Sequence, residues 1–409
     1  MLSRLWLSLF VLGLLGGCVT AWQGQTQVFA AMVQALTVSA ETSVHIGLTL
    51  AGVMAFWLGL FKVAESAGWV DGLARCLSPV LRRLMPDVPA GHPALGAMSM
   101  NLAANLLGLD NAATPFGLRA MRELQSLNAS EDQVSNAQIM FLMLNCNALC
   151  LLPVSIFAYR AQAGSLDPAL VFLPILISSL MALLLALSLT MLIQRIRPDR
   201  VLVAGVMLLL LILIGLGVLH HELTVATLSR LSSVVGNALV LVVIVGILLT
   251  GFWRHTDIYT DFIQGAAEGA QVALSIFPYL VAMLSALAVL RAGGMMDVLL
   301  HFFERGWSVL GGDTAFIPAL PSMLMKPFSG SAARGMLLDV IHHEGVDSFS
   351  ARVAAVVQGS TETTFYVVTV YLGSVSLRDE RYALTLGLLT ELMGAGVAVL
   401  VGYAFFPSS

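Results

Sequence analysis

The sequence predicts an all-α polytopic membrane protein of two inverted repeats with re-entrant or broken helices, comprising about nine spans plus two hairpins. Composition is the first observation: of 409 residues, 58% are hydrophobic and 11% are charged, whereas soluble domains usually carry about 25% charged residues. The second is that apolar segments near the ~20 residues needed to cross a bilayer recur along the chain. The third is that one block of sequence occurs twice.

The N-terminal segment 4–21 is expected to be an uncleaved first helix. Arg4 followed by an apolar run is also typical of a signal peptide, and the letters "LGGC" end at Cys18 like a lipoprotein cleavage box. We favour the uncleaved helix because a polytopic chain follows it, and we keep cleavage as the alternative.

Further apolar segments are long enough to be spans. They are 43–64, 137–158, 169–193, 201–219, 234–253, 272–291, 352–373 and 383–406. Two others, 94–118 and 314–337, have Pro, Gly, Asn or Ser at their centres, so we expect each to form a hairpin that enters and leaves on one side. Amphipathic patterns at 25–40, 66–85 and 295–310 predict helices at the membrane interface.

Basic residues indicate the orientation. With a cytoplasmic N-terminus and two re-entrant hairpins, most of the 20 Lys and Arg residues fall on the cytoplasmic side, including the loop "RIRPDR" at 195–200. If the hairpins spanned the bilayer instead, Arg119 and Arg122 would move outside and the bias would weaken. We therefore expect a multi-pass protein of the inner (cytoplasmic) membrane.

An internal repeat divides the chain. "PALGAMSMN" at 93–101 matches "PALPSMLMK" at 318–326, within copies that cover about 41–165 and 268–377. Because three expected spans separate the copies, the copies face opposite ways. Inverted repeats with paired broken segments are typical of secondary transporters with a site near the membrane midplane. A structural duplication without transport is the alternative.

The second copy places a polar cluster at the start of an apolar run, "QGSTETTFYVVTVYLG". The residues predicted to bind a substrate are Gln358, Ser360, Thr361, Glu362 and Thr363. Gln358 and Glu362 share a face if the segment is helical, and a carboxylate near hydrocarbon is costly enough to suggest a function. The cluster suits a polar solute, or a proton or cation coupled to it. The alternative is a helix cap of the capping-box type.

Other candidate substrate-binding residues come from the first copy and from the hairpins. They are Asn145, Asn147, Asn105, Asp110, Asn111, Ser329 and Ser331. The segment "NCNALC" that corresponds to "QGSTET" lacks a carboxylate, so the two sites are expected to be unequal. Lys326 and Arg334 either pair with Glu362 or extend to the interface. Glu41 and Glu268 are interpreted as acids at the N-termini of equivalent helices.

Other classes of site find no support in the sequence. The four cysteines have neither CxxC nor secreted spacing, and Cys146 and Cys150 are interpreted as packing residues. "HHE" occurs at 220–222 and at 342–344, where a polar loop is favoured over a divalent-metal site. A nucleophile triad, phosphate-binding loop, dinucleotide-binding motif, zinc-protease motif and basic stripe are all missing from the sequence. We expect no enzyme activity, cofactor, metal or nucleic-acid partner.

Long motifs resemble two known families. "MNLAANLLGLDNAATPFGLRAM" resembles spore maturation protein A, while "MKPFSGSAARG" and "VVQGSTETTFYVVTVYLGSV" resemble spore maturation protein B. The resemblance implies a natural fusion of an A-like half (1–200), linking helices (201–254) and a B-like half (255–409). It also implies the nucleoside recognition, or Gate, domain shared with concentrative nucleoside transporters and with ferrous-iron transporter B.

The nucleoside transporters bind their substrate with a Gln-Thr-Glu motif in a re-entrant hairpin. "QGSTET" is similar, but Gly359 and Ser360 separate Gln358 from Thr361, so the resemblance does not fix a nucleoside as the substrate. It also makes a hairpin-like form of 352–373 an alternative to a simple span.

Three functions fit these observations. The first is a secondary permease for a small polar solute, nucleoside-like solutes included, with a proton or cation coupled through Glu362. The second is a non-transporting membrane factor in envelope or spore maturation that acts with envelope or peptidoglycan enzymes. The third is a divalent-metal permease. All three functions require the lipid bilayer as a partner, and all three are compatible with a homo-oligomer.

Overall fold

The computed structural model describes residues 2–107, 110–196, 224–309 and 311–407, with residues 200, 203, 207, 210, 211, 214 and 215 between them. In these parts the chain is helical, with an isolated β-bridge between Gln133 and Asp379 and no strand. The predicted all-α class is therefore confirmed. The predicted span at 201–219 lies outside the described residues, apart from the scattered positions just named.

Five described helices are long and apolar enough to cross a membrane. They are α2 (Val28–Ser66), α8 (Phe172–Gln194) together with the preceding 3-10 turn η1 (Pro168–Val171), α10 (Val225–Trp253), α11 (Ile258–Ala292) and α17 (Ala383–Phe405). The first helix, α1 (Leu2–Trp22), is apolar over the shorter stretch Trp6–Trp22. The chain is thus a multi-pass membrane protein. The number of long apolar helices in its described part is smaller than the number of spans predicted from the sequence.

Two of the predicted continuous spans are wrong, because each is broken into two shorter helices. Segment 137–158 forms α6 (Asn136–Cys146) and α7 (Val154–Gln162), with Pro153 directly before α7, where a missing N–H is tolerated. Segment 352–373 forms α15 (Phe349–Ser360) and α16 (Thr364–Gly373). Thr361 between them is extended, with φ −141° and ψ 166°.

The predicted interfacial helix at 25–40 is also wrong, because α2 begins at Val28 and continues without a break to Ser66. Its sequence is apolar enough for one long helix. The other two amphipathic segments form separate helices, α3 (Trp69–Leu84) and α12 (Met295–Val309).

The two segments predicted as hairpins are each divided into shorter helices. The first forms α4 (Pro93–Leu106) and α5 (Asp110–Gln125); the second forms η2 (Ile317–Ala319), α13 (Leu320–Met325) and α14 (Gly330–Glu344). That these pairs re-enter the membrane stays a prediction.

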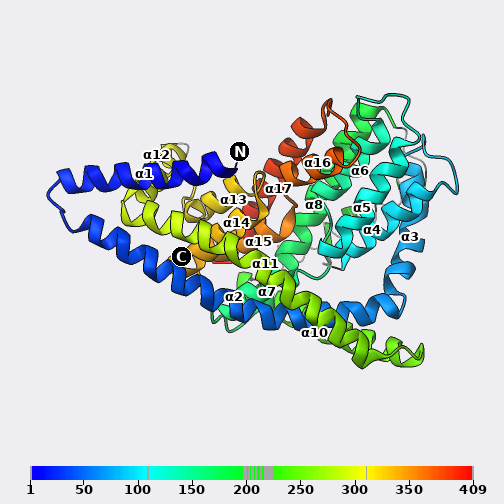
Figure 1. The fold of residues 1–409 in the computed structure, drawn as a ribbon, viewed down its shortest axis with the longest axis horizontal. Helices are drawn as coiled ribbons and strands as arrows, with labels where there is room; N and C mark the ends of the chain where they lie inside the picture. The colour runs from blue at the N-terminus through cyan, green and yellow to red at the C-terminus, as the bar shows by residue number, and fades with distance from the viewer. Residues whose placement is uncertain are drawn as a thin grey trace.

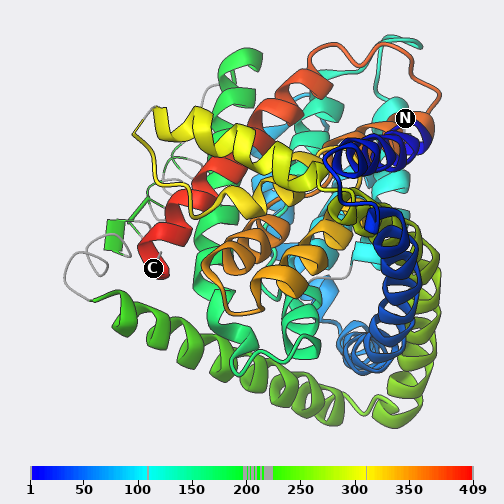
Figure 2. The same cartoon turned by 90° about the vertical axis from the view of Figure 1, so that its left-hand side faces the viewer.

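The long helices α2 and α11 pack side by side in antiparallel directions (Figure 1, Figure 2). Two glycines of α11 make this possible, because a Cβ on Gly265 would clash with the Leu58 carbonyl oxygen and one on Gly269 would clash with that of Met54. Small residues four apart let membrane helices approach closely, which increases their van der Waals contact. The two halves therefore meet along a backbone-to-backbone contact.

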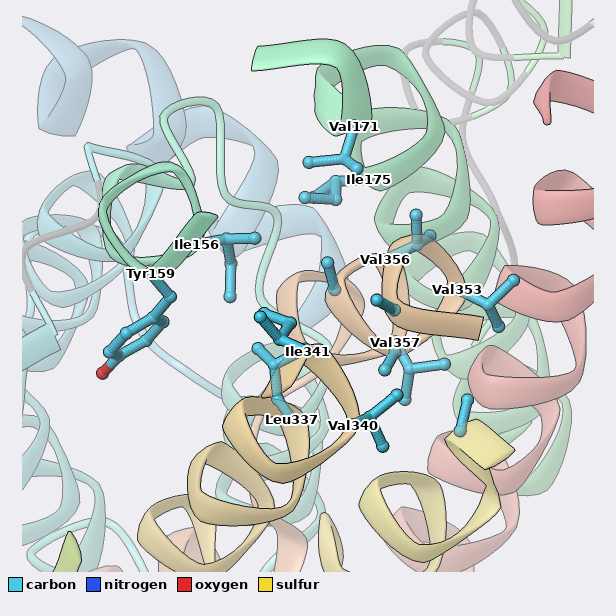
Figure 3. Close-up of a cluster of buried hydrophobic side chains, with 14 of the residues drawn as sticks. Ile156, Tyr159, Val171, Ile175, Leu337, Val340, Ile341, Val353, Val356 and Val357 are labelled. Carbon is cyan, nitrogen blue, oxygen red and sulfur yellow. The ribbon is translucent and has the colours of Figure 1, made fainter. Parts of the chain in front are cut away.

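An apolar core joins the halves a second time. Figure 3 shows side chains of α7, η1 and α8 from the first half beside those of α14 and α15 from the second. The labelled residues are Ile156, Tyr159, Val171, Ile175, Leu337, Val340, Ile341, Val353, Val356 and Val357. Such shared burial makes the two halves one packed body rather than two independent domains.

Polar contacts connect loops of the two halves at opposite ends of α8. Before α8, the fully buried Arg160 binds Asp347, which follows α14, at 2.7 Å. Beyond α8, Gln133 Nε2 donates to Asp379 at 2.8 Å, and Arg381 Nη1 donates to Asn136 Oδ1 at 3.0 Å. The end of α8 lies at this second cluster, since Gln194 Nε2 donates to the Asn136 carbonyl at 2.9 Å.

We expect Gly265→Ala and Gly269→Ala each to force α2 and α11 apart and to reduce the free energy of unfolding by about 1–3 kcal/mol. A lower midpoint of thermal unfolding in detergent would show this. The matched control is Gly396→Ala on α17, where an added Cβ meets no atom within 4 Å. Equal midpoints for Gly269→Ala and the control would contradict the close contact.

Candidate functional site

A cavity of about 1210 Å³ lies between the two halves, beside both broken helices. Its walls come from α2, from residues 150–159, from the turn between α13 and α14, and from the break between α15 and α16. Among the described residues, the charged ones at its wall are Arg4, Lys62, Glu65, Glu268, Lys326, Arg334 and Glu362. Aromatic residues such as Trp57, Phe328 and Phe365 cover other parts, so the cavity offers charges of both signs beside apolar faces.

The break between α15 and α16 is held by two buried side chains, one a hydrogen-bond donor and the other an acceptor. Lys326, 4% exposed, donates from Nζ at 2.8 Å to the carbonyl of Gln358 in the last turn of α15. Glu391 of α17, 2% exposed, accepts from the N–H of Thr364, the first residue of α16, at 3.2 Å. The last carbonyls and the first N–H groups of a helix have no partner within it, so a donor at the end of α15 and an acceptor at the start of α16 each satisfy such a group.

Backbone hydrogen bonds join this break to neighbouring segments. The Glu362 N–H donates to the Cys146 carbonyl at the end of α6 at 2.9 Å, and the Phe365 N–H donates to the Pro327 carbonyl at 3.0 Å. In the first half, the Leu151 N–H donates to the Leu106 carbonyl at the end of α4 at 3.0 Å. These bonds pair part of the backbone of each break within the protein, as non-helical backbone at membrane depth requires.

The structure brings together five of the predicted substrate-binding residues. Those that line the cavity are Gln358, Glu362, Thr363, Ser329 and Ser331. Ser360 and Thr361 are buried behind the wall, where the Ser360 hydroxyl donates to the Val356 carbonyl. The capping-box alternative is wrong, because Thr363 stands at the N-cap of α16 without a side-chain cap. Binding by the cavity-lining residues stays a prediction.

The predicted asparagines lie in a buried polar network instead of on the cavity wall. Asn145 Oδ1 accepts from Asn105 Nδ2 and from the Tyr371 hydroxyl, both at 3.1 Å, while Asn101 Nδ2 donates to the same hydroxyl at 3.2 Å. Asn147 Nδ2 donates to the Thr390 hydroxyl at 3.0 Å. These bonds connect α4, α6, α16 and α17. The side chains of Asp110 and Asn111 lie outside the described part of the chain.

Glu391 was not among the predicted site residues, although the sequence carries a signal for it. It is the single carboxylate of the apolar run 383–406, and a lone acid in such a run is costly unless it is bonded. Of the two alternatives for Lys326, extension to the interface is wrong, since the side chain is buried. Glu41 and Glu268 do not stand at helix N-termini, because α2 begins at Val28 and α11 at Ile258.

The second "HHE" triplet ends α14 rather than forming a loop. His343 Nδ1 lies 2.9 Å from the Asp339 carbonyl oxygen, and the Asp339 carboxylate binds Arg291 at 2.7 Å. Among the described residues, no group of three or more His, Cys, Asp or Glu side chains is placed to hold a metal ion. The first triplet, 220–222, falls outside the described residues.

Comparisons with known proteins match the two halves separately. Residues 47–163 match a family model described as Gate: Nucleoside recognition. The chain is 41% identical over 174 residues to spore maturation protein B of Bacillus subtilis (strain 168), which covers 42% of this chain and 95% of that protein. It is 35% identical over 184 residues to spore maturation protein A of the same organism, which covers 44% of this chain and 90% of that protein. The two matches fall on different halves of the chain.

We expect Glu391→Leu to destabilise the protein by about 1–3 kcal/mol, because the buried N–H of Thr364 loses its acceptor. Glu391→Gln keeps an acceptor and should retain most of the stability. The thermal midpoint in detergent measures both effects. Glu41→Leu, at an exposed position of α2, is the control, and a Glu391→Leu variant as stable as this control would rule out the cap.

Proposed function

Because this chain belongs to the family of spore maturation proteins A and B and carries both in one polypeptide, we propose that it is a secondary permease for a small polar solute. It acts in the inner (cytoplasmic) membrane. The observation that carries the proposal is the cavity between the halves, which both halves line and against which both helix breaks lie. Membrane transporters commonly bind solutes where broken helices meet.

The order and direction of the helices support two inverted repeats. The helices α2 and α11, which precede the two copies of the broken elements, are antiparallel. The helices α8 and α17, which follow the broken elements in each half, also run in opposite directions. Asn136 contacts Gln194 at the end of α8 and Arg381 just before α17, so the end of one helix lies beside the start of the other.

Equivalent loops also lie at opposite ends of the molecule. The α5–α6 loop contacts the α16–α17 loop through Gln133 and Asp379 beyond the end of α8. The α14–α15 loop, which is the counterpart of the α5–α6 loop, contacts the α7–α8 region through Asp347 and Arg160 before α8. This is the arrangement that an inverted repeat requires for alternating access.

Glu362 is the proposed coupling residue, because it is the carboxylate at the break and lines the cavity. A proton or cation bound there would alter the charge of the wall against which the solute lies. The Gate match, described as nucleoside recognition, supports a nucleoside-like solute as one member of the polar class.

The names of the relatives favour a second candidate function. Both are spore maturation proteins, which fits a membrane factor that acts with envelope or peptidoglycan enzymes. In that case the cavity would hold a ligand without moving it across the membrane.

Reconstitution into liposomes tests transport directly. We expect uptake of at least one radiolabelled solute from a panel of nucleosides, amino acids and sugars. Gln358→Ala and Glu362→Gln should each lower the initial rate about tenfold or more, as expected for a lost hydrogen bond to a charged or buried group. Glu344→Gln, an exposed acid at the end of α14, should leave the rate unchanged. Uptake that is insensitive to both site substitutions would refute the site, and a lack of uptake across the panel would favour the second candidate.

Cysteine labelling tests the inverted topology. In a variant whose four cysteines are replaced by alanine, single cysteines at Glu131 and Arg378 should react only with reagents on the cytoplasmic side. Cysteines at Ala163 and Glu344 should react only from the other side. All four positions are exposed in the structure. Labelling of Glu131→Cys and Glu344→Cys from the same side would contradict the inverted arrangement.

A further inference from the structure

A second cavity, of about 390 Å³, lies between the end of α3, the start of α6 and the end of α8. Its charged and amide-bearing wall residues, among those that the structure describes, are Arg83, Asp87, Asn136, Gln194 and Arg195. None of these five lines the larger cavity between the two halves. Pockets that bind small groups commonly measure about 300–1,000 Å³, so this cavity is large enough for a ligand of its own.

The second cavity lies at the level where a membrane-spanning helix ends. α8 is long and apolar enough to cross a bilayer, and Gln194 is its last residue. The bond from Gln194 Nε2 to the Asn136 carbonyl, 2.9 Å long, fixes this end of α8 beside the start of α6. A group bound in the cavity would therefore lie at the depth of lipid headgroups rather than in the hydrocarbon.

Guanidinium groups from three segments meet at this cavity. Arg83 of α3 and Arg195 after α8 line it, and Arg381 before α17 donates from Nη1 to Oδ1 of the wall residue Asn136 at 3.0 Å. Among the described residues, Asp87 is the acid on this wall, so positive charge exceeds negative charge there. A guanidinium binds phosphate oxygens through paired hydrogen bonds, and this arrangement therefore suits a phosphate.

Two of these arginines have a backbone conformation that favours glycine. Arg195 has φ 54° and Arg381 has φ 51°. Residues other than Gly adopt this left-handed conformation uncommonly, and a helix that ends in it usually has Gly there. The turn at Arg381 is held by Asp379, whose carboxylate accepts from the Arg381 N–H at 2.9 Å and from Gln133 Nε2 at 2.8 Å. Arginine at both positions is consistent with a role for the guanidinium itself.

Exposed apolar side chains lie one turn before each arginine of the wall. Val80 precedes Arg83 by three residues on α3, and Leu192 precedes Arg195 by three residues at the end of α8. Residues three apart lie on the same face of a helix. A free phosphate would leave these apolar surfaces uncovered, whereas the acyl chains of a phospholipid would cover them. The apolar surfaces therefore favour a lipid as the source of the phosphate.

We propose that the second cavity binds the phosphate headgroup of an anionic phospholipid, whose acyl chains lie along Val80 and Leu192. Basic pockets beside membrane helices are suited to anionic headgroups. A zwitterionic lipid fits less well, because its headgroup would bring a cation towards Arg83 and Arg195. The lipid would connect the amphipathic helix α3 to the end of α8. This site is separate from the permease function proposed above and does not depend on it.

Native mass spectrometry of the purified full-length protein in detergent tests the proposal, because it resolves the protein with and without bound lipid. Dioleoyl phosphatidylglycerol is the anionic probe. Dioleoyl phosphatidylcholine has the same acyl chains with a zwitterionic headgroup, and glycerol 3-phosphate has the phosphate without acyl chains. We expect phosphatidylglycerol to bind at least about fivefold more tightly than either of the other two, which corresponds to about 1 kcal/mol.

Two variants with opposite expected effects locate the site. Arg195→Gln should lower the affinity for phosphatidylglycerol about threefold or more, because a guanidinium is lost. Asp87→Asn should raise the affinity, because the carboxylate on the wall is lost. Arg75→Gln and Asp71→Asn make the same charge changes at exposed positions of α3 outside the wall and should bind like the unaltered protein. Arg195 and Asp87 are exposed, so both variants should keep the thermal midpoint of the unaltered protein.

Three results would overturn the lipid site. Equal affinity for phosphatidylglycerol and phosphatidylcholine would show that the protein does not recognise the anionic headgroup. Glycerol 3-phosphate binding as tight as that of phosphatidylglycerol would indicate a site for a free anion. Equal losses of affinity in Arg195→Gln and Arg75→Gln would indicate a general attraction to the charged surface of the protein instead of binding in the cavity.

Discussion

The structure depends on the requirement that a helix broken at membrane depth must have its backbone groups satisfied by the protein itself. Between α15 and α16 two side chains from different elements contribute to this: Lys326 after α13 binds the end of α15, and Glu391 of α17 binds the start of α16. The same segment is bonded to α6 through the Glu362 N–H. The break is therefore fixed from three directions, and the cavity wall that it forms has a defined shape.

The rest of the fold keeps these elements in place. The glycine contact between α2 and α11 brings the two halves together along their longest helices, and the core shown in Figure 3 joins them again near α7, α8, α14 and α15. Beside the break of the first half, Asn145 and Asn147 bond to Tyr371 and Thr390. Both partners come from the second half, so neither break is complete without the other half.

The sequence was sufficient to predict those features that depend on one local pattern of residues. Hydropathy predicted the all-α membrane class. The clustered polar residues predicted a substrate site at Gln358, Glu362 and Thr363; these line the cavity, and binding by them stays a prediction. It failed where tertiary contacts decide. Hydropathy cannot distinguish a continuous span from α15 and α16, because the break depends on Lys326 and Glu391, which are distant in sequence. The asparagines of the first half looked like ligands because residue type alone does not show that Tyr371 and Thr390 already bind them.

The polar connections at the two ends of α8 differ in how deeply their side chains are buried, so the two ends respond differently to the loss of a side-chain partner. At one end, separating the loops would leave the fully buried guanidinium of Arg160 without its carboxylate, a cost of about 3–5 kcal/mol for a buried charge. At the other end, Gln133, Asp379 and Arg381 meet in exposed bonds, where water replaces a lost partner at a cost of about 0–1 kcal/mol. The loops at this second end also share backbone hydrogen bonds, from the Val134 N–H to the Asp379 carbonyl and from the Arg378 and Asp379 N–H groups to the Asp132 carbonyl. One end is therefore held by a buried ion pair and the other by main-chain pairing under an exposed polar surface.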